Sequence, residues 1–545
     1  MASSLRARGA FHNSAALLAI AAFVIGLLLA RLPLPLSLAV TGGGALLLFA
    51  LVEPLAGLAF MLLLGPAEPL LYAAYPSIPI PWGQIGVAIF VGGWTLRCLA
   101  RRELRWPHLP ITLPFVLYLF AITLSFTVQQ VRSPFAAMQE LVKWLEMYLV
   151  AGIVAGVAGR KRLGWVLAIV FLVGVVQAGI GFWQFQFRGH GPEGFRILGT
   201  HFRAYGTFEQ PNPFGGFMGL VWPVAASLAM AMALEFVRNF RVSRLERAIV
   251  LLRKNCADRE DVDPRSHTKE HQEFFVKLRG LRGLFLVAAG SRAIVLFGSA
   301  LVAIATLAAL FLSFSRGAWL GAVAAAGVML IFWPRRRWFG IGLAAGGLAA
   351  FLLLYNLGLL PSAIATRFAD VGDFVQVYDV RGVHINDSNF SIVERLAHWQ
   401  AALNMAEANP IVGVGLNNYD QAYDDYRLIN WRYSLGHAHM IYLNVLAETG
   451  IVGLAAYLFL WGGVLFITVR AINRNGGLER ALAVGLLGAW VHLATHQILD
   501  NLYVGNIALY LGALLGVLCI LGEAPGAGRN DEDHDLPSTP HIATS

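Results

Sequence analysis

Long apolar runs separated by short polar connections make up most of this chain. Each run has about 18 or more residues, the length that a helix needs to cross the hydrocarbon core of a membrane. The runs lack the alternation of apolar and polar residues that a transmembrane barrel strand shows. A backbone in lipid must satisfy its own hydrogen bonds, so a helix bundle is the remaining solution. After a first run within residues 1–30, the expected spans are 35–52, 54–75, 84–100, 110–128, 142–158, 163–185, 213–235, 292–312, 317–333, 338–360, 450–470, 481–499 and 502–522.

The pattern therefore predicts an all-α, polytopic transmembrane helix bundle with about 12–14 spans and one large polar loop, residues 361–440, which we expect to carry the active site. Composition supports this class, because 57% of the residues are hydrophobic and 13% are charged, whereas soluble domains carry about 25% charged residues. The formal net charge of +9 is then a topology signal, so we expect membrane lipids and no nucleic acid among the partners. The three cysteines are far apart and indicate no disulfide framework.

The basic residues indicate how the chain crosses the membrane. With the N-terminus inside, the dense basic clusters all fall on one face, which the positive-inside rule makes cytoplasmic. The clusters are Arg97/Arg101/Arg102/Arg105, Arg160/Lys161/Arg162, the 236–291 segment, Arg335/Arg336/Arg337 and Arg470/Arg474/Arg480. The first apolar run follows a basic start, and because it is long and further spans follow, we interpret it as an uncleaved helix.

The same pattern divides the chain into consecutive parts. Residues 236–291 carry many charges of both signs, and we interpret them as a helical hairpin on anionic headgroups, with a regulatory or partner-docking role as the alternative. Residues 523–545 have the composition of a disordered cytoplasmic tail. The parts are 1–190 (N-terminal transmembrane helices), 191–235 (outer loop and span), 236–291 (cytoplasmic basic insertion), 292–360 (transmembrane helices), 361–440 (large non-cytoplasmic loop), 441–522 (C-terminal transmembrane helices) and 523–545 (tail).

Arginines on the non-cytoplasmic face work against the insertion bias, and two of them sit inside recognisable strings. Arg203 lies in a polar loop that returns into a span through Asn212, and Arg316 lies at a tight turn between two spans. A guanidinium binds phosphate oxygens bidentately, so arginines that converge at the outer surface suit the diphosphate of a lipid-linked substrate. The alternative is that each arginine snorkels to the interface or pairs with an acid.

Four strings occur in order between about residues 195 and 500: GTFEQPNPFGG, SFSRGAWLG, ERLAHWQAALNMAEANPIVGVGLNNY and HAHMIYLNVLAETGIVGL. Together they resemble the O-antigen ligase and O-antigen polymerase family. The resemblance assigns Arg203 and Arg316 to the family's arginines in the first two strings, Arg395 to that of the third, and His439 to its essential histidine. Met440 stands where the family usually has asparagine, so the imidazole is kept and that amide is absent here.

The resemblance implies a multi-pass protein of the bacterial inner membrane that transfers a glycan from undecaprenyl diphosphate to an acceptor lipid or glycan at the outer face, with no nucleotide, metal or other cofactor. In that reaction His439 would be the general base for the attacking hydroxyl, and Arg203 and Arg316 would stabilise charge on the leaving diphosphate. A polymerase, a protein O-oligosaccharyltransferase and a non-enzymatic bicarbonate or small-solute transporter remain as alternatives.

Other ionisable residues surround these positions in sequence. His437 is two residues from His439, and a metal pair is open by spacing, but no third ligand stands nearby in sequence, so we expect no metal. Glu448 is either functional or a packing acid. His492, His496 and Asp500 follow one another at helical spacing, which predicts one helical face and a supporting role.

Several aromatic residues flank the end of the polar loop. They are Tyr419, Tyr423, Tyr426, Trp431 and Tyr433. We interpret them as interfacial anchors, with stacking on sugar rings as the alternative.

Overall fold

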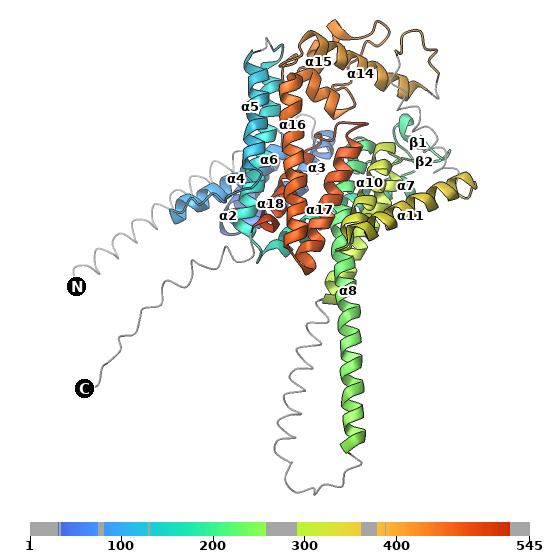
Figure 1. Cartoon of the computed structure of the whole chain (residues 1–545). Coiled ribbons are helices and arrows are strands. Elements are labelled where there is room, and N and C mark those ends of the chain that lie inside the picture. Colours follow the sequence, from blue (N-terminus) through green and yellow to red (C-terminus); the bar gives the residue numbers. More distant parts are fainter. Residues whose placement is uncertain are drawn as a thin grey trace, which may run out of the picture.

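A computed structural model describes residue 31 and residues 34–74, 81–128, 131–257, 292–360, 379–386 and 389–523. It is a bundle of long helices with a smaller group of helices at one end (Figure 1). The labelled helices are α2 (Leu34–Val52), α3 (Pro54–Ala74), α4 (Trp82–Arg101), α5 (Thr112–Val128), α6 (Pro134–Ala158), α7 (Leu163–Gln186), α8 (Pro211–Ala257), α10 (Arg316–Phe332), α11 (Arg337–Asn356), α14 (Phe390–Ala408), α15 (Tyr419–Tyr426), α16 (Ile441–Arg474), α17 (Gly477–His496) and α18 (Ile507–Gly522). A further helix covers Arg292–Leu312, and the short strands β1 (Arg196–Ile197) and β2 (His201–Phe202) form an antiparallel pair.

The predicted class, an all-α polytopic helix bundle, is confirmed. Among the described residues, 8 helices are long and apolar enough to cross a membrane by length and composition. Every span predicted between 35 and 522 coincides with a helix, although α6 and α16 begin earlier and α18 begins later than the sequence predicts. The span predicted within 1–30, most of the 236–291 insertion and nearly all of the 523–545 tail lie outside the described residues.

Glycines allow the central helices to approach one another closely. α17 packs between α8 and α10, and α18 packs against α6. A Cβ at Gly219 of α8 or at Gly321 of α10 would overlap the imidazole of His492 on α17, and a Cβ at Gly317 would overlap His496. Small residues at such crossings are the usual means of helix association in membranes. Here they also make room for two buried imidazoles.

The group of helices at one end of the bundle is called here the polar cap, meaning the described residues between 379 and 440. Figure 1 shows α14 and α15 of the cap beyond the start of α16, at the end of the molecule away from the long extension of α8. The cap has its own apolar core, in which Tyr419 and Tyr423 of α15 pack with Met405 of α14. Both tyrosines are buried, so interfacial anchoring was the wrong interpretation for them.

A break in α16 joins the cap to the bundle. Gly450 has φ 64° and ψ −167°, which interrupts the helix, and such a conformation is essentially restricted to glycine. The segment 410–415 inserts at this break: Val414 N–H donates to Ala447 O and Gly415 N–H donates to Glu448 O, both at 2.9 Å. The Glu448 side chain accepts a bond of 3.2 Å from the Tyr419 N–H at the start of α15. Glu448 is buried at this junction.

The fold predicts that Gly450→Ala destabilises the protein. A Cβ at this position would overlap the carbonyl of Ile411, and the strained backbone adds to the cost, so we expect a loss of about 1–3 kcal/mol and a lower melting temperature in detergent. Gly462→Ala is the matched control, because it lies on the same helix with open space around it. Equal melting temperatures for the two variants would contradict the role of the break.

Charged connections gather at the end of the bundle opposite the cap. Arg160, between α6 and α7, pairs with Glu479 at the start of α17. Arg480 donates to Trp333 O at 2.8 Å, next to the α10–α11 connection. At the cap end, Arg132 of the α5–α6 connection pairs with Asp425. The basic connections around Arg160 and Arg480 therefore lie at the end of the bundle opposite the cap, and which end faces the cytoplasm stays a prediction.

Cysteine labelling tests which end faces the cytoplasm. In a variant with Cys98, Cys256 and Cys519 replaced by serine, Ile429→Cys in the cap should react with a membrane-impermeant maleimide in intact spheroplasts, because Ile429 is 88% exposed. Lys161→Cys, at the opposite end, should react only after permeabilisation. The reverse pattern would invert the predicted topology.

Candidate functional site

A polar pocket of about 100 Å³ lies where the cap meets the bundle. It is called here the arginine pocket. Its lining residues are Arg203, Asn212, Phe314, Ser315, Arg316, Gly317, Ser391, Arg395, His496 and Leu499. The three arginines come from segments that are far apart in sequence, and the fold brings all three predicted guanidinium groups to one pocket.

The β1–β2 hairpin positions Arg203. Immediately after β2, Arg203 N–H donates to Phe195 O at 2.8 Å and Ala204 N–H donates to Leu312 O at 2.9 Å. The Arg203 guanidinium donates through Nε to Ser313 O at 2.8 Å and through Nη2 to Asn212 Oδ1 at 3.1 Å. Arg203 thereby connects the start of α8 to the turn before α10, and Asn212 orients the Arg203 guanidinium.

Two helices begin at this pocket. α8 starts at Pro211, directly before the lining residue Asn212. α10 starts at Arg316, and Ser315 caps it by accepting a hydrogen bond from Ala318 N–H. Helix N-termini carry partial positive charge and unpaired N–H groups, so both favour an anion. The pocket therefore has the electrostatics of an anion-binding site.

Arg395 of α14 completes the pocket from the cap side. Burial lowers the pKa of Arg395, and the carboxylate of Asp500 opposes that effect. Its guanidinium nevertheless stays protonated at neutral pH. Arg395 is therefore a buried cation between the arginine pocket and the histidines described next.

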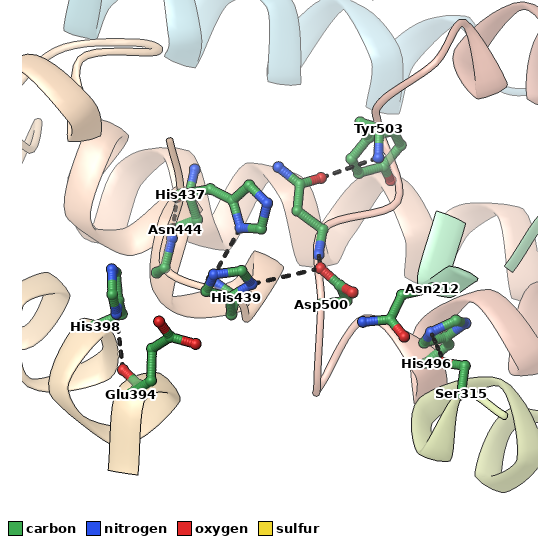
Figure 2. A network of polar contacts seen from close by, with 12 residues as sticks. Asn212, Ser315, Glu394, His398, His437, His439, Asn444, His496, Asp500 and Tyr503 are labelled. Atoms are coloured by element: carbon green, nitrogen blue, oxygen red, sulfur yellow. Dashed lines mark hydrogen bonds and ion pairs between the residues drawn. The ribbon is translucent and has the colours of Figure 1, made fainter. Parts of the chain in front are cut away.

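His439 lies beside the arginine pocket and next to Asp500. Its Nδ1 is 3.8 Å from Asp500 Oδ1, and Figure 2 shows His439 between His398 and Asp500, with Asn212, His496 and Ser315 beyond Asp500. The backbone of His439 has φ 52°, an uncommon left-handed conformation that tends to occur at functional sites. Ile441 N–H donates to Gln497 O at 3.1 Å, which holds the segment after His439 against the connection that carries Asp500.

Asp500 is a buried carboxylate, 5% exposed, whose charge is compensated locally. Burial alone would raise the pKa of Asp500, but His439, His437 and Arg395 outweigh it, and the pKa lies below its ordinary range. Asp500 also accepts a hydrogen bond of 2.8 Å from Asn501 N–H. Asp500 is therefore a buried anion beside the His439 imidazole.

Two further imidazoles surround His439. His437 Nδ1 accepts a hydrogen bond of 3.0 Å from His439 N–H. Burial and the nearby His439 lower the pKa of His437 to about 4. The ring centroid of His398 is 5.5 Å from that of His439, and burial also lowers the pKa of His398. Both neighbours are therefore neutral at neutral pH.

The expectation that no third metal ligand stands near the histidine pair was wrong. Asp500, which comes from the α17–α18 connection, lies with His437 and His439 so that one ligand atom from each falls within 4.8 Å of the others. Two imidazoles and a carboxylate are chemically able to bind zinc. The tertiary structure therefore makes a metal chemically possible at this cluster, although the sequence spacing disfavours one.

The predicted helical face of α17 is only partly correct. His492 and His496 do face the bundle interior from one side of α17, and His496 lines the arginine pocket, with Nε2 3.4 Å from Ser315 Oγ. α17 ends at His496, so Asp500 lies in the following connection and turns toward His439 instead. Helical spacing therefore misplaced Asp500.

The sequence also missed residues of the third string. His398 and Glu394 of α14 lie beside His439 in Figure 2. Burial raises the pKa of Glu394, although His439 and Arg395 oppose the shift. Both residues stand within the string ERLAHWQ that carries Arg395, and one helical turn between Glu394 and His398 was the available signal. Glu448 lies at the break in α16 and is not among the residues that line the arginine pocket.

The described structure defines a multi-pass membrane protein with an arginine-lined pocket beside a histidine–aspartate pair. Residues 301–458 match the family model of the O-antigen ligase, and no curated protein matches the chain. The resemblance to this family is thereby confirmed over residues 301–458. Members of the family are membrane glycan ligases and polymerases, which supports glycosyltransferase-type activity in general. The matched region includes Arg316, Arg395, His437 and His439.

Proposed function

We propose that this protein transfers a glycan from an undecaprenyl-diphosphate donor to an acceptor hydroxyl at the outer face of the bacterial inner membrane. The observation that carries the proposal is that Arg395, which lines the arginine pocket, interacts electrostatically with Asp500, which in turn lies beside His439. One part of the site suits a diphosphate and the adjoining part suits proton transfer. A glycosyl transfer from a lipid diphosphate needs both.

In the proposed reaction, the acceptor oxygen attacks the anomeric carbon of the donor glycan as the bond from that carbon to the phosphate oxygen breaks. The hydroxyl proton passes to His439, and the electron pair of the broken bond leaves with the undecaprenyl diphosphate. Arg203, Arg316 and Arg395 stabilise the charge on this leaving group. Asp500 stabilises the imidazolium that forms. A single displacement of this kind inverts the anomeric centre.

A polymerase of the same family would use the same site with a second lipid-linked glycan as acceptor. The difference between the two reactions lies in the acceptor alone, so the assay must supply candidate acceptors separately. For a transporter, the expected arrangement would be ionisable groups at the bilayer midplane in broken helices. The arginine pocket instead lies at the junction of cap and bundle, lined by residues of α14 and by the starts of α8 and α10.

The first prediction concerns the base. His439→Gln should reduce transfer by about 10²–10⁴-fold, because the attacking hydroxyl loses its proton acceptor. Purified protein is given polyprenyl-diphosphate-linked glycan and acceptor in EDTA, and product is measured over time. His384→Gln is the matched control, since His384 is exposed in the cap and should retain activity. Full activity of His439→Gln would exclude this base, and loss of wild-type activity in EDTA with recovery on adding zinc would assign the three-ligand cluster to a metal.

The second prediction concerns the diphosphate. Arg316→Gln and Arg203→Gln should each lower kcat/KM for the donor by roughly 10- to 150-fold, because each removes charge-assisted hydrogen bonds of about 1.5–3 kcal/mol. Arg316→Lys should recover only part of this loss, because lysine keeps the charge without the bidentate geometry. Arg196→Gln is the control, since the Arg196 side chain is 51% exposed and pairs only with Glu193 among the ion pairs described. Unchanged donor kinetics in both pocket variants would place the diphosphate elsewhere.

A further inference from the structure

The cap contains a second polar cavity, on another side of the histidines from the arginine pocket. It has a volume of about 450 Å³ and is called here the cap cavity. Its lining residues are Asp420, Tyr423, Asp424, Arg432, Tyr433, Ser434, Leu435 and Gly436. The cavity therefore lies between α15 and the segment that leads directly into His437.

The lining of the cap cavity has the chemistry that recognises a sugar. Asp420 and Asp424 offer carboxylate oxygens as acceptors, Arg432 offers guanidinium donors, and Tyr433 is an aromatic side chain that is 80% exposed. Ser434 donates to Asp420 and Arg427 pairs with Asp424, so these carboxylates are held in place. An aromatic ring with a polar edge beside fixed hydrogen-bonding groups suits a ring that has apolar faces and a rim of hydroxyl groups.

Tyr423 provides an independent indication that the cap cavity takes a ligand. Its side chain is 1% exposed, yet its hydroxyl has no hydrogen-bond partner within the part of the chain that the structure describes. Burial raises the pKa of Tyr423 to about 12, so the hydroxyl stays protonated at neutral pH. Buried polar groups are almost always paired, and Tyr423 lines the cavity. A sugar hydroxyl in the cavity would supply the missing partner.

Side-chain contacts through His398 connect the lining of the cap cavity to His439. The ring of Tyr423 stacks on that of His398 with centroids 5.2 Å apart, and His398 Nε2 lies 3.1 Å from Tyr433 O. The His398 ring is in turn 5.5 Å from the His439 ring. Figure 2 places His398 and Asp500 on opposite sides of His439, with the arginine-pocket residues Asn212, Ser315 and His496 on the Asp500 side.

This arrangement matches what a displacement requires. The nucleophile must approach the anomeric carbon from the side opposite the leaving group, and the base must contact the nucleophile. The arginine pocket on one side suits the leaving diphosphate, and the cap cavity on the other side suits the molecule that carries the attacking hydroxyl. We propose that the cap cavity binds the sugar of the acceptor, stacked on Tyr433 and hydrogen-bonded to the Tyr423 hydroxyl. The inference rests on the proposed transferase function.

The test separates the acceptor from the donor kinetically. Initial rates of transfer are measured while the acceptor saccharide and the lipid-linked donor are varied independently. Tyr423→Phe removes a single hydroxyl and Tyr433→Ala removes an exposed ring, and each should raise KM for the acceptor about 3- to 10-fold. The donor KM should stay at the wild-type value, because neither residue lines the arginine pocket.

Tyr426→Phe is the matched control. Tyr426 lies on the same helix, does not line the cap cavity, and its hydroxyl accepts a hydrogen bond of 3.3 Å from Asn409 Nδ2. It should leave the acceptor KM unchanged. Because Tyr433 lies at the surface, Tyr433→Ala still tests the proposal if the Tyr423→Phe variant proves unstable in a melting experiment.

The outcomes distinguish this inference from the function on which it rests. If wild-type protein turns over no lipid-linked donor with any acceptor, the proposed transferase function fails. If the wild type transfers glycan and both cavity variants keep the acceptor KM of the Tyr426→Phe control, the acceptor site is wrong. A rise in the donor KM with an unchanged acceptor KM would assign the cavity to the donor glycan and also overturn the proposal.

Discussion

The insertion of residues 410–415 into the break of α16 is the contact on which the candidate site depends. The backbone bonds from Val414 and Gly415 to Ala447 and Glu448 attach the cap to a membrane helix. That attachment places α14, with Arg395 and His398, against α16, which begins two residues after His439. The break costs helical hydrogen bonds, and the inserted segment replaces them. An unbroken α16 would offer no backbone groups to hold the cap.

Electrostatic balance explains why the charged groups are tolerated where cap and bundle meet. The Arg203 guanidinium donates hydrogen bonds to Ser313 O and Asn212 Oδ1. Arg395 and His439 face Asp500, the buried anion of the group. The starts of α8 and α10 add partial positive charge at the arginine pocket.

Two polar cavities of different character lie on either side of the group formed by His398, His439 and Asp500. The arginine pocket is small, cationic and lined by helix N-termini, whereas the cap cavity is larger and mixes carboxylates, tyrosines and a guanidinium. A transfer reaction between two glycan-bearing substrates needs two such sites and one proton acceptor between them. The neutral state of His398 and His437 at neutral pH leaves the charge near His439 under the control of Asp500 and Arg395.

The sequence alone determined the helix-bundle class, the approximate positions of the spans and the candidates Arg203, Arg316, Arg395 and His439. The spans can be predicted because a continuous run of about 20 apolar residues is enough to cross the lipid bilayer. The candidate residues can be predicted because each of the matching strings is continuous in sequence. Only the tertiary structure decided the neighbours of His439. Asp500 seemed to belong to the helical face of His492 and His496, but α17 ends at His496 and Asp500 turns toward the start of α16. The sequence also did not indicate that Tyr423 is buried, that Asp500 is a third possible metal ligand, or that Glu448 lies at the break. Each of these features depends on packing between segments that are distant in the chain, and no local sequence pattern indicates such packing.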